Sequence, residues 1–113
     1  MNDQELLELA AKAIGGSIHE IHENYAWLIV ASEIEKDQSQ LIMWSPLNDD
    51  GDALRLAVKL RMDIEPWIHG CSACARVCCG EILIDEPHYG DDPERATRRA
   101  ITRVAAEIGK AMP

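Results

Sequence analysis

The chain has 113 residues, enough for one hydrophobic core and too few for two, so we expect a single domain covering residues 1–113. Its composition, with 47% hydrophobic and 27% charged residues, excludes a disordered chain. Its net charge of −9 disfavours general nucleic-acid binding, because an acidic surface repels a phosphate backbone.

The N-terminal region predicts a helix and no targeting segment. Asn2 can cap a helix with Glu5 three residues later, and Gly15-Gly16 supplies the left-handed conformation that often ends helices. The first residues are acidic, unlike a signal peptide, and no apolar run is long enough to span a membrane. We therefore expect a cytoplasmic protein whose four cysteines are reduced.

Residues 17–44 are predicted to form two or three antiparallel strands, which Pro46 ends. A second helix is predicted to follow, beginning at an acidic turn with Asp49 or Asp50 as its cap. Its core side is expected to carry three apolar residues at helical spacing, Leu54, Ala57 and Val58.

Two extended segments are predicted next. The segment 62–68 contains Pro66, which favours a strand end, and 75–85 is expected to be a return strand in which Gly80 marks a β-bulge. A long final helix then follows, with Asp92 as its cap. This order of elements predicts an α+β fold, in which an antiparallel sheet of four to five strands packs with three helices.

A cysteine cluster follows His69 in the pattern C-x2-C-x3-C-C, formed by Cys71, Cys74, Cys78 and Cys79. Thiolates two residues apart can bind zinc from a turn, so His69, Cys71, Cys74 and Cys78 are a candidate metal site. If the segment is a strand, however, Cys78 and Cys79 point to opposite faces and cannot share one ion. We favour small, partly buried side chains of a hairpin, and expect no cofactor.

Histidines and aspartates supply two weaker metal candidates. His19 and His22 lack the H-E-x-x-H spacing of zinc hydrolases, and surface histidines are the better interpretation. The Asp49–Asp52 turn lacks the register of a calcium loop. Helix capping explains these aspartates without a metal.

Basic residues concentrate on the last helix, where Arg95, Arg98, Arg99, Arg103 and Lys110 are predicted to share one side. Arginine forks bind phosphate or carboxylate, so the four arginines are candidate ligands for a small anion or a nucleotide. The alternative is that they pair with the chain's own carboxylates, or with those of a second copy in a homo-oligomer.

Three blocks of sequence carry a family resemblance: Glu5–Ala13, Trp44–Leu60 and Gly90–Gly109. With these residues the chain resembles the phage ABA-sandwich domain family, small proteins of tailed bacteriophages and prophages. Ser45 departs from the asparagine that is more frequent in that family. The resemblance implies a layered α/β/α sandwich and a protein acting in the cytoplasm of a bacterial host. The family has no established activity, so it implies no functional residues.

The sequence contains no Walker loop, no G-x-G-x-x-G and no G-x-S-x-G, and hence offers no catalytic argument. We expect a bacteriophage or prophage accessory protein, a non-enzymatic binding module that acts on a host component. The alternative is a protein that sequesters a small anion or nucleotide through the arginine face. A metal-dependent enzyme built on the Cys/His segment is less favoured.

Overall fold

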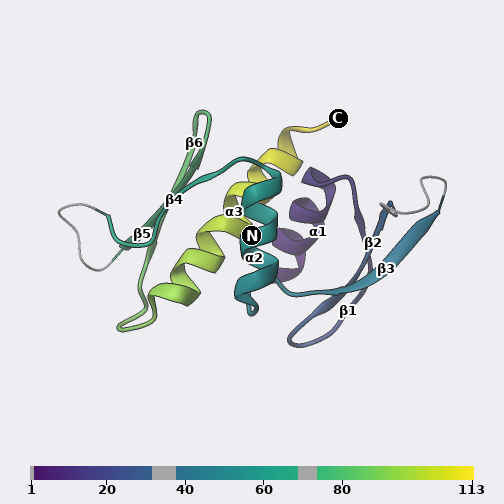
Figure 1. The fold of residues 1–113 in the computed structure, drawn as a ribbon, viewed down its shortest axis with the longest axis horizontal. Coiled ribbons are helices and arrows are strands. Elements are labelled where there is room, and N and C mark those ends of the chain that lie inside the picture. Colours follow the sequence, from purple (N-terminus) through teal and green to yellow (C-terminus); the bar gives the residue numbers. More distant parts are fainter. Residues whose placement is uncertain (1, 32–37, 69–73) are drawn as a thin grey trace.

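The structure, a computed structural model, describes residues 2–31, 38–68 and 74–113 (Figure 1). Helices and strands alternate along the chain in groups. Their order and bounds are α1 (Asp3–Ala13), β1 (Ser17–Ile21), β2 (Ala26–Ala31), β3 (Ser39–Trp44), α2 (Asp50–Lys59), β4 (Asp63–Glu65), β5 (Cys74–Cys79), β6 (Ile82–Pro87) and α3 (Pro93–Ala111). No helix within the described ranges combines the length and the hydropathy that a membrane span requires.

The described strands form two antiparallel sheets of three strands each, an N-terminal sheet β1-β2-β3 and a C-terminal sheet β4-β5-β6. The α+β class is confirmed, but the prediction of one sheet with four to five strands is wrong. Part of the error lies at Gly80, whose φ of 60° places it in a two-residue hairpin loop instead of a bulge. The segment predicted as one strand is therefore the hairpin of β5 and β6.

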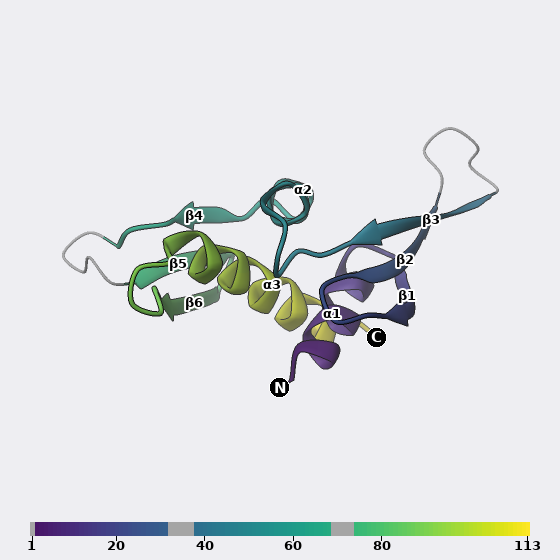
Figure 2. The ribbon, with the colours of Figure 1, turned by 90° about the horizontal axis from the view of Figure 1, so that it is seen from below.

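The helices lie between the two sheets (Figures 1 and 2). The helix α1 lies beside the N-terminal sheet, the first half of α3 lies on the C-terminal sheet, and α1 and α3 pack against each other. The layers thus run sheet, helices, sheet, which is the reverse of the predicted α/β/α order. A small sheet has one apolar face to cover, and here a central layer of helices covers one face of each sheet.

The core of the described residues is mainly aliphatic and rich in alanine, with one aromatic residue, Trp44. The fully buried positions on α3 include Ala100, Val104 and Ala105, and the N-terminal sheet contributes Leu28 and Trp44. Small side chains on α3 allow neighbouring elements to approach closely, so α3 can pack against both α1 and the C-terminal sheet.

The buried face of α2 differs from the prediction. Ala53, Leu56 and Ala57 are buried, whereas Leu54 and Val58 are 57% and 68% exposed. Apolar residues surround much of this helix, so periodicity alone did not decide which side faces the core. Two large apolar side chains are consequently left on the surface.

An αβββ unit occurs twice in the structure, which the sequence did not reveal. Asp49 and Asp92 cap the helices that follow the two sheets, and the N–H of each donates to the carbonyl four residues earlier, at Ser45 and His88. The ends of α1 and α2 also correspond: each is followed by a left-handed residue, Gly15 with a φ of 76° and Arg61 with a φ of 57°. The acidic turns before α2 and α3 therefore occupy equivalent places in two copies of one unit.

Candidate functional site

The acidic turns are helix caps, as predicted. Asp49 Oδ2 accepts a hydrogen bond of 2.8 Å from the Asp52 amide, and Asp92 Oδ1 accepts one of 3.0 Å from the Arg95 amide. Asp52 is used in turn by the preceding loop, where its Oδ2 accepts from the Ser45 amide at 2.9 Å. These bonds satisfy amides that a helix start leaves without partners, and each cap is worth about 1 kcal/mol.

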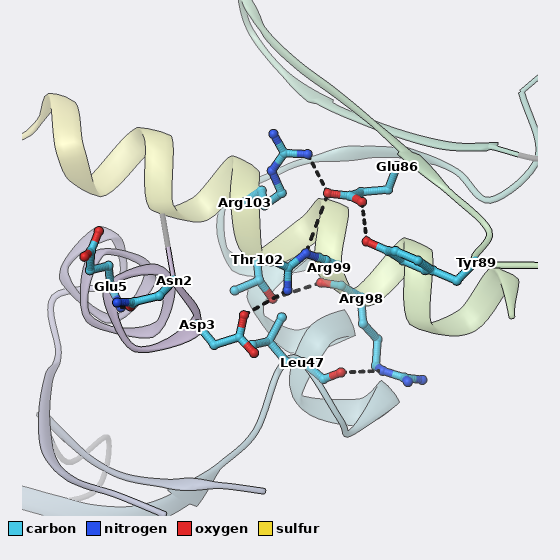
Figure 3. A network of polar contacts seen from close by, with 10 residues as sticks. All are labelled: Asn2, Asp3, Glu5, Leu47, Glu86, Tyr89, Arg98, Arg99, Thr102 and Arg103. Carbon is cyan, nitrogen blue, oxygen red and sulfur yellow. Dashed lines mark hydrogen bonds and ion pairs between the residues drawn. The ribbon is translucent and has the colours of Figure 1, made fainter. Parts of the chain in front are cut away.

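The arginines of α3 do not project as one free face. Arg98 points toward α2, where its Nη1 donates to Asp50 Oδ1 at 2.7 Å and its Nε to the Leu47 carbonyl at 3.0 Å. Arg99 turns the other way and donates to Asp3 Oδ1 of α1 at 2.9 Å (Figure 3). The guanidinium of Arg95 lies 4.8 Å from the centre of the Tyr89 ring, a cation–π contact.

Glu86 lies at the centre of the polar network in Figure 3. Its side chain is only 6% exposed, and its two oxygens accept hydrogen bonds from Arg103 and, at 2.6 Å, from the Tyr89 hydroxyl. Arg99 adds a longer ion pair of 3.9 Å. Burial, together with the bond to Glu86, raises the pKa of Tyr89. This network joins β6 to α3, and the positive charges of Arg99 and Arg103 are already matched by carboxylates of the chain.

The structure places only part of the proposed metal site. His69 and Cys71 lie outside the described residues, while Cys74 and Cys78 lie on β5. The adjacent Cys79 belongs to the opposite face of β5 from Cys78, since it packs against the core with its Sγ 3.4 Å from the Leu60 carbonyl oxygen. Within the described ranges, no group of three or more His, Cys, Asp and Glu side chains could hold a metal ion.

The two N-terminal histidines are surface side chains. His19 is exposed on β1, and the His22 ring stacks on Tyr25 with 4.7 Å between ring centres. His22 Nε2 also lies 3.5 Å from Glu20 Oε1. Ring stacking and this contact account for His22 without a ligand.

A pocket of about 300 Å³ opens between α2, β4 and α3. Most of its lining is apolar, and two of the apolar side chains are also strongly exposed, Leu54 at 57% and Trp67 at 55%. The lining residues are Asp50, Ala53, Leu54, Ile64, Pro66, Trp67, Pro93, Glu94, Thr97, Arg98 and Ile101. A concave apolar site with a few polar groups at its rim is the usual form of a binding pocket.

Trp67 is held in place despite its exposure. The His88 ring packs against it edge to face, with 4.4 Å between ring centres and 81° between the planes. His88 is itself buried, at 3% exposure, and its Nε2 lies 2.8 Å from the Pro66 carbonyl oxygen. The indole is therefore a preorganised wall of the pocket. The sequence analysis did not single out Trp67, because its exposure depends on how β4 and α3 meet.

Charge at the rim of the pocket is unbalanced. Arg98 and Asp50 neutralise each other in their ion pair, whereas Glu94 forms no ion pair with any described residue. The Thr97 hydroxyl is occupied by a 2.7 Å bond to the Pro93 carbonyl within α3. The pocket thus combines apolar walls with one carboxylate, in the first turn of α3, that forms no ion pair with a described residue.

Comparison of the chain with protein-family models, with characterised proteins and with solved structures finds no match. The resemblance to the phage ABA-sandwich family therefore stays a prediction. The structure itself defines an α+β protein in which two three-stranded sheets flank a layer of helices, with an apolar pocket beside that layer.

Proposed function

We propose that this protein is a non-enzymatic binding module whose pocket receives an apolar side chain from a basic segment of a partner protein. The observation that carries the proposal is the pocket between α2, β4 and α3, with Leu54 and Trp67 exposed at 57% and 55% on its walls. A preformed apolar hollow beside an exposed tryptophan is the form that the energetically dominant contacts of protein interfaces take.

The charge of the site favours a basic partner. Glu94 lies at the rim without an ion pair to any described residue, and the chain as a whole carries a net charge of −9. An acidic surface attracts basic segments at long range and repels acidic ones. This attraction raises the association rate constant, and the repulsion makes binding more selective. Given the resemblance to phage proteins, the expected partner is a protein of the bacterial host.

The chemistry of the lining supports binding rather than catalysis. No histidine, cysteine or serine is among the described residues that line the pocket. The Thr97 hydroxyl and the Arg98 guanidinium both have partners within the fold. The alternative anion site on α3 lacks comparable support, because Arg98, Arg99 and Arg103 already donate to Asp50, Asp3 and Glu86.

A peptide display library tests the proposal with the intact chain as bait. We expect enrichment of peptides in which one large apolar residue is flanked by lysine or arginine. Leu54→Lys should weaken their binding at least tenfold. Val58→Lys is the matched control, because Val58 is an exposed apolar residue of the same helix that does not line the pocket.

The same selection can contradict the proposal in two ways. Binding of the enriched peptides that falls equally in Leu54→Lys and Val58→Lys would place the site outside the pocket. Enrichment of acidic peptides would contradict the assignment of a basic partner. A charge reversal at Glu94, Glu94→Lys, should shift the preference of the library toward acidic flanking residues.

A further inference from the structure

Three of the four edge strands in the two sheets carry protection against pairing with another chain. The strand β1 contains Glu20 and a shift in its pairing register, β4 contains two acidic residues, and β6 contains Asp85 and Pro87. Charges, prolines and irregular pairing are the usual means by which proteins keep sheet edges from associating.

The edge strand β3 has none of these features. Its sequence, Ser-Gln-Leu-Ile-Met-Trp, contains no charged residue and no proline, and it pairs with β2 in unbroken register over Ser39–Trp44. On its other side no described strand pairs with it. Its outward N–H and C=O groups are thus available to a further strand.

The side chains beside this edge are apolar as well. On the face of the N-terminal sheet that points away from the helices, Trp27 lies opposite Met43 and Ile29 opposite Leu41. Met43 is 57% exposed and Leu41 is 50% exposed. The polar side of this face lies at β1, where Glu20 is paired with Trp27. The apolar area therefore borders the free edge of β3 and not the protected edge of β1.

We propose that β3 pairs with β3 of a second copy of this chain, antiparallel across a two-fold axis, so that the two N-terminal sheets join into one. Charge argues for a second copy at this place. Each chain carries a net charge of −9, so most of its surface repels another copy, but β2 and β3 contain no charged residue. A two-fold contact requires only one surface that is complementary to itself.

The geometry of antiparallel pairing adds side-chain contacts to the backbone hydrogen bonds. Residues that lie directly opposite each other across an antiparallel pair point to the same face of the sheet. Leu41 and Met43 would therefore meet Leu41 and Met43 of the second copy on the outward face. Pairing would therefore bury part of the apolar surface that Leu41 and Met43 expose in each chain.

Sedimentation of charge variants tests this contact. The unmodified chain is expected to be a dimer, and Leu41→Lys and Met43→Lys are expected to shift it to monomer. Leu83→Lys is the matched control, since Leu83 is an outward-facing residue of the edge strand β6 with 52% exposure and should leave the dimer intact. Higher salt should strengthen the dimer, because screening weakens the repulsion between two acidic chains.

Amide hydrogen exchange separates edge pairing from face-to-face stacking of the sheets. With edge pairing, outward-pointing amides of residues 39–44 exchange at least tenfold more slowly in the dimer than in Leu41→Lys, while amides of 82–86 do not change. A monomeric unmodified chain, a Leu41→Lys variant that stays dimeric, or a dimer in which the β3 amides remain unprotected would each overturn the proposal. None of these outcomes depends on the pocket of α2 and α3.

Discussion

Gly109 of α3 lies directly against the backbone of Leu9 in α1. A Cβ atom placed on Gly109 would lie 1.9 Å from the carbonyl oxygen of Leu9 and 2.8 Å from its carbonyl carbon. Backbone atoms cannot move aside as a flexible side chain can, so only glycine fits this crossing. The contact sets how closely the first and last helices approach.

Replacing this glycine should separate the two helices. We expect Gly109→Ala to lower the free energy of unfolding by about 3 kcal/mol or more, as overpacking against a rigid neighbour does. Urea denaturation measures the effect. Gly51→Ala serves as the control, because a Cβ there would be 3.2 Å from two side-chain ends, Arg55 Nη2 and the capping oxygen Asp49 Oδ2, which need to shift by only a few tenths of an ångström. A change of less than about 1 kcal/mol is expected for the control, so equal losses in both variants would contradict the assignment.

Arg61 occupies a backbone conformation that glycine adopts more easily. Its φ of 57° follows the end of α2, as Gly15 with a φ of 76° follows the end of α1. Arg61→Gly should therefore raise the free energy of unfolding by about 0.5–1 kcal/mol, and Gly15→Ala should lower it by about 1 kcal/mol. Thermal unfolding should show a higher melting temperature for Arg61→Gly and a lower one for Gly15→Ala. No heavy atom lies within 4 Å of a Cβ at Gly15, so a loss there comes from the backbone alone.

The Tyr89 hydroxyl is the only donor to Glu86 Oε2 among the described residues. Tyr89→Phe should lower the free energy of unfolding by about 1–3 kcal/mol, because it leaves a buried carboxylate oxygen without that partner. Tyr25→Phe is the control, since the Tyr25 hydroxyl has no hydrogen bond within the described part of the chain, and a change below about 0.5 kcal/mol is expected. Chemical denaturation of both variants distinguishes a lost hydrogen bond from a general effect of removing a hydroxyl.

Acid should weaken the pairing of Arg76 with Asp85. Arg76 donates to the two carboxylate oxygens at 2.7 and 3.1 Å, and these bonds, opposed by burial, lower the pKa of Asp85 below its ordinary value of 3.8. A lowered pKa in the folded state gives stability that is present above the unfolded pKa and is lost as the pH falls through the folded pKa. The loss should therefore begin near pH 4 and continue below it.

Asp85→Asn should remove that acid-dependent contribution. Because the Asp85 side chain is 43% exposed, solvent screening keeps the difference from the unmodified chain below about 1 kcal/mol. Denaturation at neutral pH and below pH 4 measures it. Asp63→Asn, at an exposed carboxylate of β4 with no ion pair in the described ranges, should leave the pH profile unchanged. A profile that Asp85→Asn leaves intact would show that the pair does not contribute.

The parts of the fold that depend on local chemistry could be predicted from the sequence. Asn2, Asp92 and either Asp49 or Asp50 were expected as helix caps, and the structure confirms Asn2 and Asp92 and selects Asp49. Capping requires only a side-chain oxygen and an amide three residues later, so neighbouring residues contain the whole signal. The last helix was also predictable, because its buried positions repeat at helical spacing.

Features that depend on distant parts of the chain could not be predicted. Gly80 suits a bulge or a hairpin turn equally well, and only the pairing of β5 with β6 decides between them. The assignment of strands to two sheets, and the exposure of Leu54, likewise depend on which surfaces meet in the folded chain. The pocket forms where α3 meets α2 and β4, which precede it by a whole hairpin, so no local pattern indicated it.

The position of α3 has a consequence for how the chain reaches its structure during synthesis. This helix packs against α1, α2 and all three strands of the C-terminal sheet, yet it follows each of them along the chain. A chain emerging from the ribosome exposes its N-terminal part first. The surfaces of α1, α2 and the C-terminal sheet that α3 covers therefore stay exposed until α3 has left the ribosome, and completion of the first αβββ unit does not cover them.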